Sequence, residues 1–580
     1  IKRLGVFHRI ISTREFALAD LLLVLLGACL WLLTGILSLV AIALIPWVIR
    51  LLAGSFPFRR TSLDWFILLF VGTSWLGYWA AYDQEVAWIK VWLIFLSVLL
   101  YYALAGQPGE NFAWVCVFFF CLGVGVSIYF FLTLVIRLGL PLTLPLIHEN
   151  YAAGIAAITT PFILYVFGQP IDKRYIIFLR VFAILGSGAA LLVILVATSR
   201  GMVMAVASVV GVWLMWWLAG RNEKWSWVRS ATAFSSFIVL YLSAIALFLY
   251  IGPANSGYVS TDYHYGTGSR AELAARSIHL VLDFPFTGGG LGAFPGLYSN
   301  YILGIPFLNV PNSHNLFLDV AIEQGILGGL SFLIVFLVSI WLAARNVAET
   351  YSSQTRLRAW LTLGALIIAF VHGMVDDYLY NGSGSLFALA LAGVSVAIQP
   401  ETTRSLRSRN YFIPGSVALV LGLLLLLLNI HGLRATWYAN LGAIQMAKVE
   451  LKGFPTGQWT EPAILPQMEH AEATLRSALE EDLGSRTANH RLGLLSILRG
   501  DLTSAAVFLE KAYEKAPNHR GIIKSLGYCY VWLGDTEKAL FLLSQIPEAK
   551  EELGVYTWWL EDHGRPDLSE KASQFLSRLE

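Results

Sequence analysis

The sequence predicts an all-α, polytopic membrane protein with about thirteen transmembrane helices, followed by a helical repeat domain. Three observations lead to this fold class. Of the 580 residues, 57% are hydrophobic and only 13% are charged, whereas soluble domains have about 45–50% apolar and about 25% charged residues. Apolar runs long enough to cross a bilayer recur up to residue 431. The polar remainder repeats with the period of paired helices.

The membrane part is expected to occupy residues 1–432. Crossing about 30 Å of hydrocarbon takes roughly 17–25 apolar residues in a helix. The predicted spans are 16–34, 35–53, 62–81, 87–105, 112–137, 150–168, 175–197, 202–219, 231–251, 315–343, 357–373, 383–398 and 411–431. The longest connection that does not span is 252–313, and long connections in compact proteins usually carry function.

Lys and Arg gather in alternate connections, which is typical of cytoplasmic loops. These residues are Lys2, Arg3, Arg9, Arg14, Arg59, Arg60, Lys173, Arg174, Arg221, Lys224, Arg229, Arg345, Arg356, Arg358, Arg404, Arg407 and Arg409. Few basic residues occur in the intervening connections, which are the one around Asp83 and Glu85, 138–149, 198–201, 252–313 and 374–382. We therefore predict a cytoplasmic N-terminus and, because the number of spans is odd, an extracytoplasmic tail.

The tail, residues 435–580, repeats every 34 residues. Gly500-Asp501 recurs as Gly534-Asp535, and Ala471, Ala505 and Ala539 are equally spaced. Paired helices with this period are the signature of tetratricopeptide repeats, and such repeats form surfaces for peptide binding or assembly. The alternative is a helical bundle with chance spacing. We expect truncation near residue 434 to leave binding by the membrane part largely intact.

Charge and cysteine content exclude several function classes. Lys plus Arg number 40 and Asp plus Glu number 38, so no basic excess indicates nucleic-acid binding. The four cysteines are Cys29, Cys116, Cys121 and Cys529. The first three lie in apolar runs and Cys529 is alone in the polar tail, so they cannot build a disulfide framework or a thiolate metal site.

The unusual polar residues of the membrane part fall on the predicted outer side. Arg200 and Arg270 carry planar forks suited to phosphate oxygens, and His314 titrates near neutral pH and suits proton abstraction. We expect these three to meet at one outer cavity. Each also has a plainer interpretation: Arg200 facing lipid phosphates, Arg270 as a solvated helix start, and His314 as a helix cap.

Further candidates support this set. Asn150 follows His148 at the start of a span, and His372 and Asp376 lie near the end of another. Glu323 lies deep in its helix, where we expect it to be neutral or paired. The glycine-rich stretch 288–292 lacks the Lys-Ser/Thr ending of a phosphate loop, so we interpret it as a turn that permits close backbone packing.

Several of these motifs resemble the O-antigen ligase and polymerase superfamily of membrane glycan transferases. The segment 311–315, Pro-Asn-Ser-His-Asn, is followed by Leu318 and by Glu-Gln-Gly at 323–325 with Gly328. Other segments match in the same order: His148-x-Asn150 with Gly154, Ser199-Arg200-Gly201, Ser269-Arg270, Pro285 to Gly292 with Phe294, and His372 with Asp376. The likeness covers about 150–395, and Ala274 replaces a tryptophan that is frequent in relatives.

The resemblance implies a GT-C-like, extracytoplasmic, inverting transferase of the bacterial inner membrane that needs neither a metal nor another cofactor. Its donor would be a glycan on undecaprenyl diphosphate, and its acceptor a hydroxyl of a lipid core, a glycan or a protein. Arg200 and Arg270 would bind the diphosphate, His314 would position or deprotonate the acceptor, and Asp376 is a weaker candidate for orienting His314. Membrane lipids and a protein bound by the tail are further expected partners.

Two alternatives within this superfamily remain, a repeat-unit polymerase and a protein O-oligosaccharyltransferase. An alternative of another class is a flippase or transporter of lipid-linked sugars. A transporter would show paired broken spans with charges near the membrane midplane.

Overall fold

The computed structural model describes residues 11, 13–137, 148–169, 174–197, 199–219, 270–302, 310–349, 352–399, 430–455 and 462–579. Every regular element in these ranges is helical. The helices of the membrane part are α2 (Arg14–Thr34), α3 (Ala41–Leu52), α4 (Asp64–Ala80), α5 (Gln84–Ala105), α6 (Phe112–Arg137), α7 (Glu149–Ile163), α8 (Arg174–Val196), α9 (Arg200–Ala219), α11 (Arg270–Asp283), α12 (Phe294–Ile302), α13 (Leu316–Glu349), α14 (Ser353–Gly373) and α15 (Ala390–Ala397).

Eight helices in the described ranges are long and apolar enough to cross a membrane: α2, α5, α6, α7 with its 3₁₀ extension, α8, α9, α13 and α14. The prediction of an all-α membrane protein is therefore confirmed. The count of thirteen spans is not, because the predicted spans 231–251 and 411–431 lie outside the described residues.

Three predicted spans form shorter helices than expected, one of them the 17-residue α4 in place of the run 62–81. The run 35–53 divides into a 3₁₀ turn, Leu37–Val40, and α3, since α2 ends at Gly35 with a left-handed backbone. The run 383–398 divides into a 3₁₀ segment, Gly382–Phe387, and the eight-residue α15. At its start the chain turns so tightly that a Cβ on Gly384 would lie 1.8 Å from the Tyr378 carbonyl oxygen.

The predicted outer connections meet at one end of the helix bundle. There, Tyr151 Oη donates to Asp377 Oδ1 at 2.8 Å, and Arg270 Nη1 donates to the Val375 carbonyl at 2.5 Å. Basic residues gather at the other end, where Arg59 Nη1 donates to the Ala105 carbonyl at 3.0 Å. This grouping is what the alternation of positive charge predicts. The orientation of the two ends in the cell remains a prediction.

The glycine-rich stretch 288–292 is a turn packed against a kink in α13. Gly288, with φ +69°, approaches α13 so closely that a Cβ would lie 2.2 Å from the Glu323 carbonyl carbon. The Gly289 amide donates to the Ile322 carbonyl at 2.7 Å, and the Ile326 amide donates to the Pro285 carbonyl at 2.9 Å. Gly325 supplies the kink with φ 78° and ψ 176°. The interpretation as a close-packing turn is confirmed.

The tail is a series of helix pairs. Its helices are α17 (Ile430–Glu450), α18 (Glu469–Glu481), α19 (Arg486–Leu498), α20 (Leu502–Lys515), α21 (Arg520–Leu533), α22 (Thr536–Leu543), α23 (Ala549–Asp562) and α24 (Pro566–Leu576). The repeated Gly-Asp dipeptide makes the turn inside two of these pairs, α19 with α20 and α21 with α22: Gly500 and Gly534 have φ +79° and +90°, and Asp501 and Asp535 cap the next helix. The 34-residue period thus corresponds to one helix pair.

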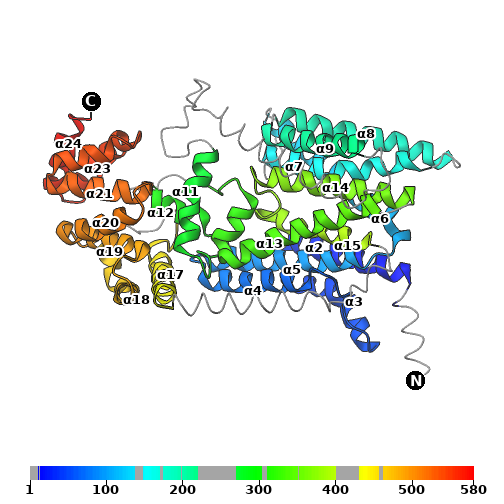
Figure 1. Ribbon diagram of the computed structural model, residues 1–580, viewed down its shortest axis with the longest axis horizontal. Coiled ribbons are helices and arrows are strands. Elements are labelled where there is room, and N and C mark those ends of the chain that lie inside the picture. The colour runs from blue at the N-terminus through cyan, green and yellow to red at the C-terminus, as the bar shows by residue number, and fades with distance from the viewer. Residues whose placement is uncertain are drawn as a thin grey trace.

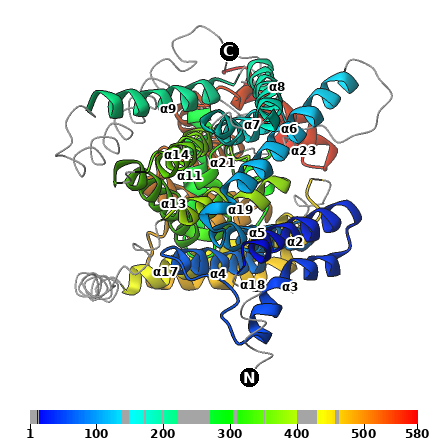
Figure 2. The ribbon, with the colours of Figure 1, turned by 90° about the vertical axis from the view of Figure 1, so that its right-hand side faces the viewer.

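The short helices α11 and α12 lie between the membrane bundle and the tail (Figure 1). Viewed along the long axis, the bundle is in front and the tail behind it (Figure 2). One buried apolar cluster joins α11 and α12 to the tail. It contains Leu280 and Phe284 of α11, Leu297 of α12, and Ile444 and Ala447 of the tail helix α17. Hence the tail lies at the same end of the bundle as the candidate site residues.

Candidate active site

Arg270 is the first residue of α11 and reaches the loop that follows α14. Its guanidinium donates to the Val375 carbonyl, and Nη1 lies 3.8 Å from Asp376 Oδ2. The Asp376 side chain is fully buried, whereas 33% of the Arg270 side chain is exposed. Arg270 is therefore anchored on one side and accessible on the other, as a ligand-binding arginine must be.

His314 has an exceptional backbone. Among the described residues it is the only non-glycine residue with positive φ, at 54°, and such outliers often mark functional sites. The Asn312 side chain holds this turn, because its Oδ1 accepts from the His314 amide at 3.0 Å.

The alternative that His314 caps α13 does not hold. Asn315 is the cap: its Oδ1 accepts from the amides of Phe317 at 3.1 Å and Leu318 at 3.0 Å. His314 Nδ1 is buried and has no hydrogen-bond partner among the described residues. The imidazole thus keeps a nitrogen available for a ligand.

Electrostatics keep the His314 imidazole neutral. Burial is the largest effect, and the positive charge of Arg270 and the nearby His148 add to it, lowering the pKa of His314 to about 4. An imidazole with this pKa is unprotonated at neutral pH and is able to accept a proton.

Asp376 lies with Arg270 rather than with His314. Burial raises its pKa, although the charge of Arg270 and a hydrogen bond from the Asn150 side chain act in the opposite direction. In the part of the chain that the structure describes, no hydrogen bond joins Asp376 to His314. The contacts of Asp376 therefore favour a role in positioning Arg270 over the predicted role in orienting His314.

A chain of hydrogen bonds supports the His314 turn from behind. Tyr151 Oη donates to Asp377 Oδ1 at 2.8 Å and accepts from Asn312 Nδ2 at 2.9 Å. Asn381 Nδ2 also donates to Tyr151 Oη, at 3.0 Å. The Asn312 side chain that holds His314 is thus fixed through Tyr151. Sequence reasoning missed Tyr151, although it directly follows the motif His148-x-Asn150.

His372 and Arg200 lie at the adjoining helix ends. His372 is fully buried, and its Nε2 lies 3.5 Å from Ser199 Oγ. A Cβ on Gly201 would lie 2.3 Å from Val375 Cγ2, so the start of α9 packs directly on the loop that anchors Arg270. The Arg200 side chain is exposed and makes no ion pair within the described ranges. His372 is placed to support the site, and Arg200 is free to bind an anion.

Glu323 is paired, as expected for a buried carboxylate. Its Oε2 lies 2.6 Å from Lys90 Nζ, and this ammonium lies 3.8 Å from the centre of the Tyr380 ring. Sequence reasoning missed Lys90, although it is the one charged residue in the apolar run 87–105. At 1.5 Å per residue, Lys90 lies about 9 Å and Glu323 about 10–11 Å from the first residues of α5 and α13.

The described ranges contain no group of three His, Cys, Asp or Glu side chains arranged to hold a metal ion. Independence of the reaction from metal ions remains a prediction.

Comparison with known proteins bears on the membrane part and the tail separately. Residues 185–333 match the family model described as O-antigen ligase. Residues 496–552 match a tetratricopeptide repeat model. A search of curated proteins found no match.

These matches confirm both resemblances inferred from the motifs. They support an O-antigen ligase/polymerase-type glycan transferase with a tetratricopeptide tail, and the apolar helices make it a multi-pass membrane protein. Of the candidate residues, Arg200, Arg270, His314 and Glu323 lie inside the first match.

Proposed function

We propose that the protein transfers a glycan from undecaprenyl diphosphate to a hydroxyl acceptor, with inversion and without a metal ion. The main support for the proposal is the state of His314: it has a left-handed backbone, its Nδ1 has no hydrogen-bond partner within the described ranges, and Arg270 lies close enough for its charge to help lower the histidine pKa, which keeps the imidazole neutral. A base and a phosphate-binding cation side by side fit transfer from a diphosphate to a hydroxyl group.

In the proposed reaction, the acceptor oxygen attacks the anomeric carbon of the donor sugar. The bond between this carbon and the diphosphate oxygen breaks, and the electron pair leaves with undecaprenyl diphosphate. The hydroxyl proton passes to the His314 imidazole. A single displacement of this kind inverts the anomeric configuration.

Arg270 and Arg200 would stabilise the negative charge that develops on the departing diphosphate. Fixed guanidinium groups in a partly desolvated site contribute several kcal/mol to such stabilisation, at an order-of-magnitude level. The negative charge of the bound diphosphate would also counteract the effect that the positive charge of Arg270 has on the His314 pKa. The His314 pKa would then rise, which makes the imidazole a stronger base when the donor is present.

The transporter alternative is less well supported by the arrangement of charges. A transporter binds its substrate near the midplane between paired broken helices. The Lys90–Glu323 pair lies near one end of α5 and α13, and the other candidate side chains lie at that same end.

The test is transfer by the purified full-length protein with a synthetic undecaprenyl-diphosphate-linked oligosaccharide. We expect His314→Ala to lower the rate by about 10²–10⁴-fold while donor binding persists. The matched control is His470→Ala, since His470 is an exposed histidine of the tail. A His314→Ala rate within tenfold of the unmodified protein would leave this histidine a structural residue.

The same assay separates the remaining alternatives. A ladder of longer lipid-linked glycans identifies a polymerase, and transfer to lipid core or to protein identifies a ligase or an O-oligosaccharyltransferase. Transfer that persists in excess chelator supports charge stabilisation by arginine. Abolition by chelator, reversed by a divalent ion, would contradict the metal-independent mechanism.

A further inference from the structure

The helix α11 presents a polar stripe that the sequence does not explain. Glu272, Arg276, His279 and Asp283 follow a spacing of four, three and four residues, which places them on one helix face. The neighbouring stripe is apolar and packs against α12 and α17. Two members of the polar stripe are buried, with Arg276 7% and Asp283 1% exposed, and a third of the Glu272 side chain is exposed. The tail contacts this stripe through Asp283, His279 and Glu272.

At the C-terminal end of α11, Asp283 binds the start of α19. Its Oδ1 accepts from the Arg486 guanidinium and from Thr487 Oγ1. Arg486 is the first residue of α19, so the carboxylate also lies at a helix N-terminus, where negative charge is favoured. Burial alone would raise the pKa of Asp283. The charges of Arg486 and Arg491 and the hydrogen bond from Thr487 outweigh this effect, so the pKa lies below its ordinary value.

In the middle of the stripe, α11 meets two histidines of the tail. The ring of His279 lies 4.4 Å from that of His519, which lies 5.2 Å from the ring of His490. His490 and His519 are both almost completely buried. Contacts between tilted and edge-on imidazole rings therefore continue the contact that Asp283 begins.

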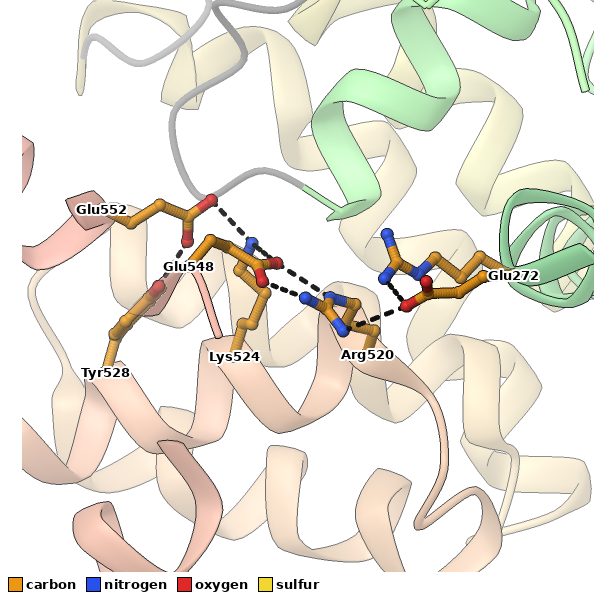
Figure 3. A network of polar contacts seen from close by, with 7 residues as sticks. Glu272, Arg520, Lys524, Tyr528, Glu548 and Glu552 are labelled. Carbon is orange, nitrogen blue, oxygen red and sulfur yellow. Dashed lines mark hydrogen bonds and ion pairs between the residues drawn. The ribbon is translucent and has the colours of Figure 1, made fainter. Parts of the chain in front are cut away.

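At the N-terminal end, Glu272 joins a network of buried charges inside the tail (Figure 3). Arg520 lies between two carboxylates: its Nη1 is 3.6 Å from Glu272 Oε1, and its Nε donates to Glu548 Oε1 at 2.8 Å. Lys524 Nζ lies 3.1 Å from Glu548 and 2.6 Å from Glu552. Only one residue, Ala271, separates Glu272 from Arg270.

We propose that the tetratricopeptide tail positions Arg270, the arginine proposed to bind the diphosphate, by holding α11 through its contacts with Asp283, His279 and Glu272. Arg270 starts α11, so a shift of the helix moves its guanidinium against the Val375 carbonyl and Asp376. Arg486, Thr487 and Arg520 are thus positioning residues for diphosphate binding, although they lie in another domain. The proposal rests on the proposed function, and it reverses the expectation that removal of the tail leaves donor binding intact.

The test uses the full-length protein with Arg486→Ala, and Thr487→Val as a milder variant that removes one hydrogen bond at similar side-chain size. The matched control is Arg499→Ala, which removes an arginine from the other end of α19 whose partner, Glu472, lies within the tail. Two quantities are measured: amide hydrogen exchange of residues 270–283, and affinity for a synthetic undecaprenyl-diphosphate-linked disaccharide.

We expect Arg486→Ala to speed exchange in α11 and to weaken donor affinity by roughly tenfold, and Arg499→Ala to change neither. Because the effect passes through Arg270, Arg486→Ala should weaken binding by less than twofold further in an Arg270→Ala background. A Thr487→Val effect in the same direction would exclude misfolding of the arginine variant as the cause.

Two results would overturn the inference while the proposed function stands: faster exchange in α11 with unchanged donor affinity, or full additivity of the Arg486 and Arg270 substitutions. If Arg270→Ala itself retained donor affinity, the proposed function would fail, and the positioning role would fall with it.

Discussion

His314 adopts a backbone conformation that costs of the order of 1–3 kcal/mol for most residues. The hydrogen bonds of the two flanking asparagines and of Ser313, whose amide donates to Asp319 Oδ1 at 2.9 Å, offset this cost. In the motif at 311–315 the other polar residues thus hold the turn, while His314 Nδ1 has no hydrogen-bond partner among the residues that the structure describes. This arrangement fits the proposed role of His314 as a base.

The pH dependence of transfer should report the environment of His314. A general base is active when unprotonated, so the rate falls as the pH drops through its pKa. In the free protein that pKa is about 4, and kcat/KM should fall only well below pH 6. With the negative diphosphate bound, the pKa rises, so the acidic limb of kcat should lie at higher pH than that of kcat/KM. Coincident limbs near pH 6.5 would show that Arg270 and burial do not act on the catalytic group.

Arg270→Lys should weaken donor affinity nearly as much as Arg270→Ala, by at least about tenfold. The planar fork of arginine reaches the Val375 carbonyl and still directs other N–H groups outward, whereas a lysine ammonium is a point charge. Binding of the lipid-linked donor measures this. Lys448→Arg is a suitable control, since Lys448 binds a backbone carbonyl on another helix. Lysine restoring full affinity at position 270 would reduce the role of Arg270 to charge alone.

At this scale the sequence identified most of the candidate site, because buried or interfacial charge is rare in membrane segments and stands out. Arg270 and Asn150 contact Asp376, and Arg270 lies close enough to His314 and His372 for its charge to act on both; that these residues and Arg200 form one catalytic site remains a prediction. The assignment of Asp376 to His314 was not supported, because the choice between two nearby partners depends on side-chain directions that spacing does not specify.

Among the helices, α5 and α13 are joined by the buried pair of Lys90 and Glu323. Lys90→Met would leave Glu323 buried without its counter-charge, and losing one partner of a buried pair costs about 3–5 kcal/mol. We expect a clear drop in the thermal unfolding temperature of the detergent-solubilised protein. A combined Lys90→Met and Glu323→Met variant should regain most of the loss.

Arg345→Met is the control for this pair, because Arg345 forms an exposed ion pair with Glu349 on the same helix α13, and exposed pairs contribute little. An unfolding temperature unchanged by Lys90→Met would show that Glu323 is already neutral in the folded protein.

The apolar runs predicted where the membrane helices lie, but they did not predict where a helix bends. The run 315–343 correctly predicted a span, whereas the kink at Gly325 depends on the turn 288–292 packing against it. Likewise, the 34-residue repeat predicted the helix pairs of the tail because their turns recur as Gly-Asp. Neither the apolar runs nor the 34-residue repeat indicates which distant segments contact one another.

At the scale of the whole molecule, the tail and α11 meet through residues more than 200 positions apart, such as Asp283 and Arg486. Sequence patterns indicated a helix beginning at Arg270 and a repeat in the tail, and the structure has both. Neither indicates that the polar stripe of the first contacts the second, since a polar face is ordinarily a solvated one. The separable tail was therefore a reasonable expectation that the buried contacts argue against.

Acid should loosen this contact. Burial lowers the pKa of His519 to about 3, compared with an ordinary value of 6.5, so the undocked state binds more protons between these values and stability falls as the pH drops below about 6.5. The loss reaches about 2 kcal/mol for one histidine at pH 5. His279, Asp283, Arg486, His490 and Arg491 face the same cluster, and protonation of Asp283 weakens the contact only at lower pH.

Hydrogen exchange of α11, normalised to the intrinsic rate at each pH, measures this loosening. The cavity of about 530 Å³ beside His279 and Asp283 gives protons access to the contact. His519→Asn is the informative variant: His519 caps α21, asparagine is a good cap, and it does not titrate. It should reduce the acid sensitivity, and an equal response in both proteins would assign the loosening to other groups.

The orientation of the molecule follows from the charge difference between the two ends of the bundle, and it is directly testable. In a variant whose four native cysteines are replaced, a single cysteine is introduced either at the exposed Ser573 of the tail or at the exposed Ser62, near Arg59 and Arg60. We expect an impermeant thiol reagent to label Ser573→Cys in intact spheroplasts and Ser62→Cys only after the membrane is opened. Both positions are solvent-facing, so the comparison depends on sidedness rather than on burial, unlike the buried Cys529. Labelling of Ser62→Cys alone in intact spheroplasts would invert the topology and move the candidate active site to the cytoplasmic face.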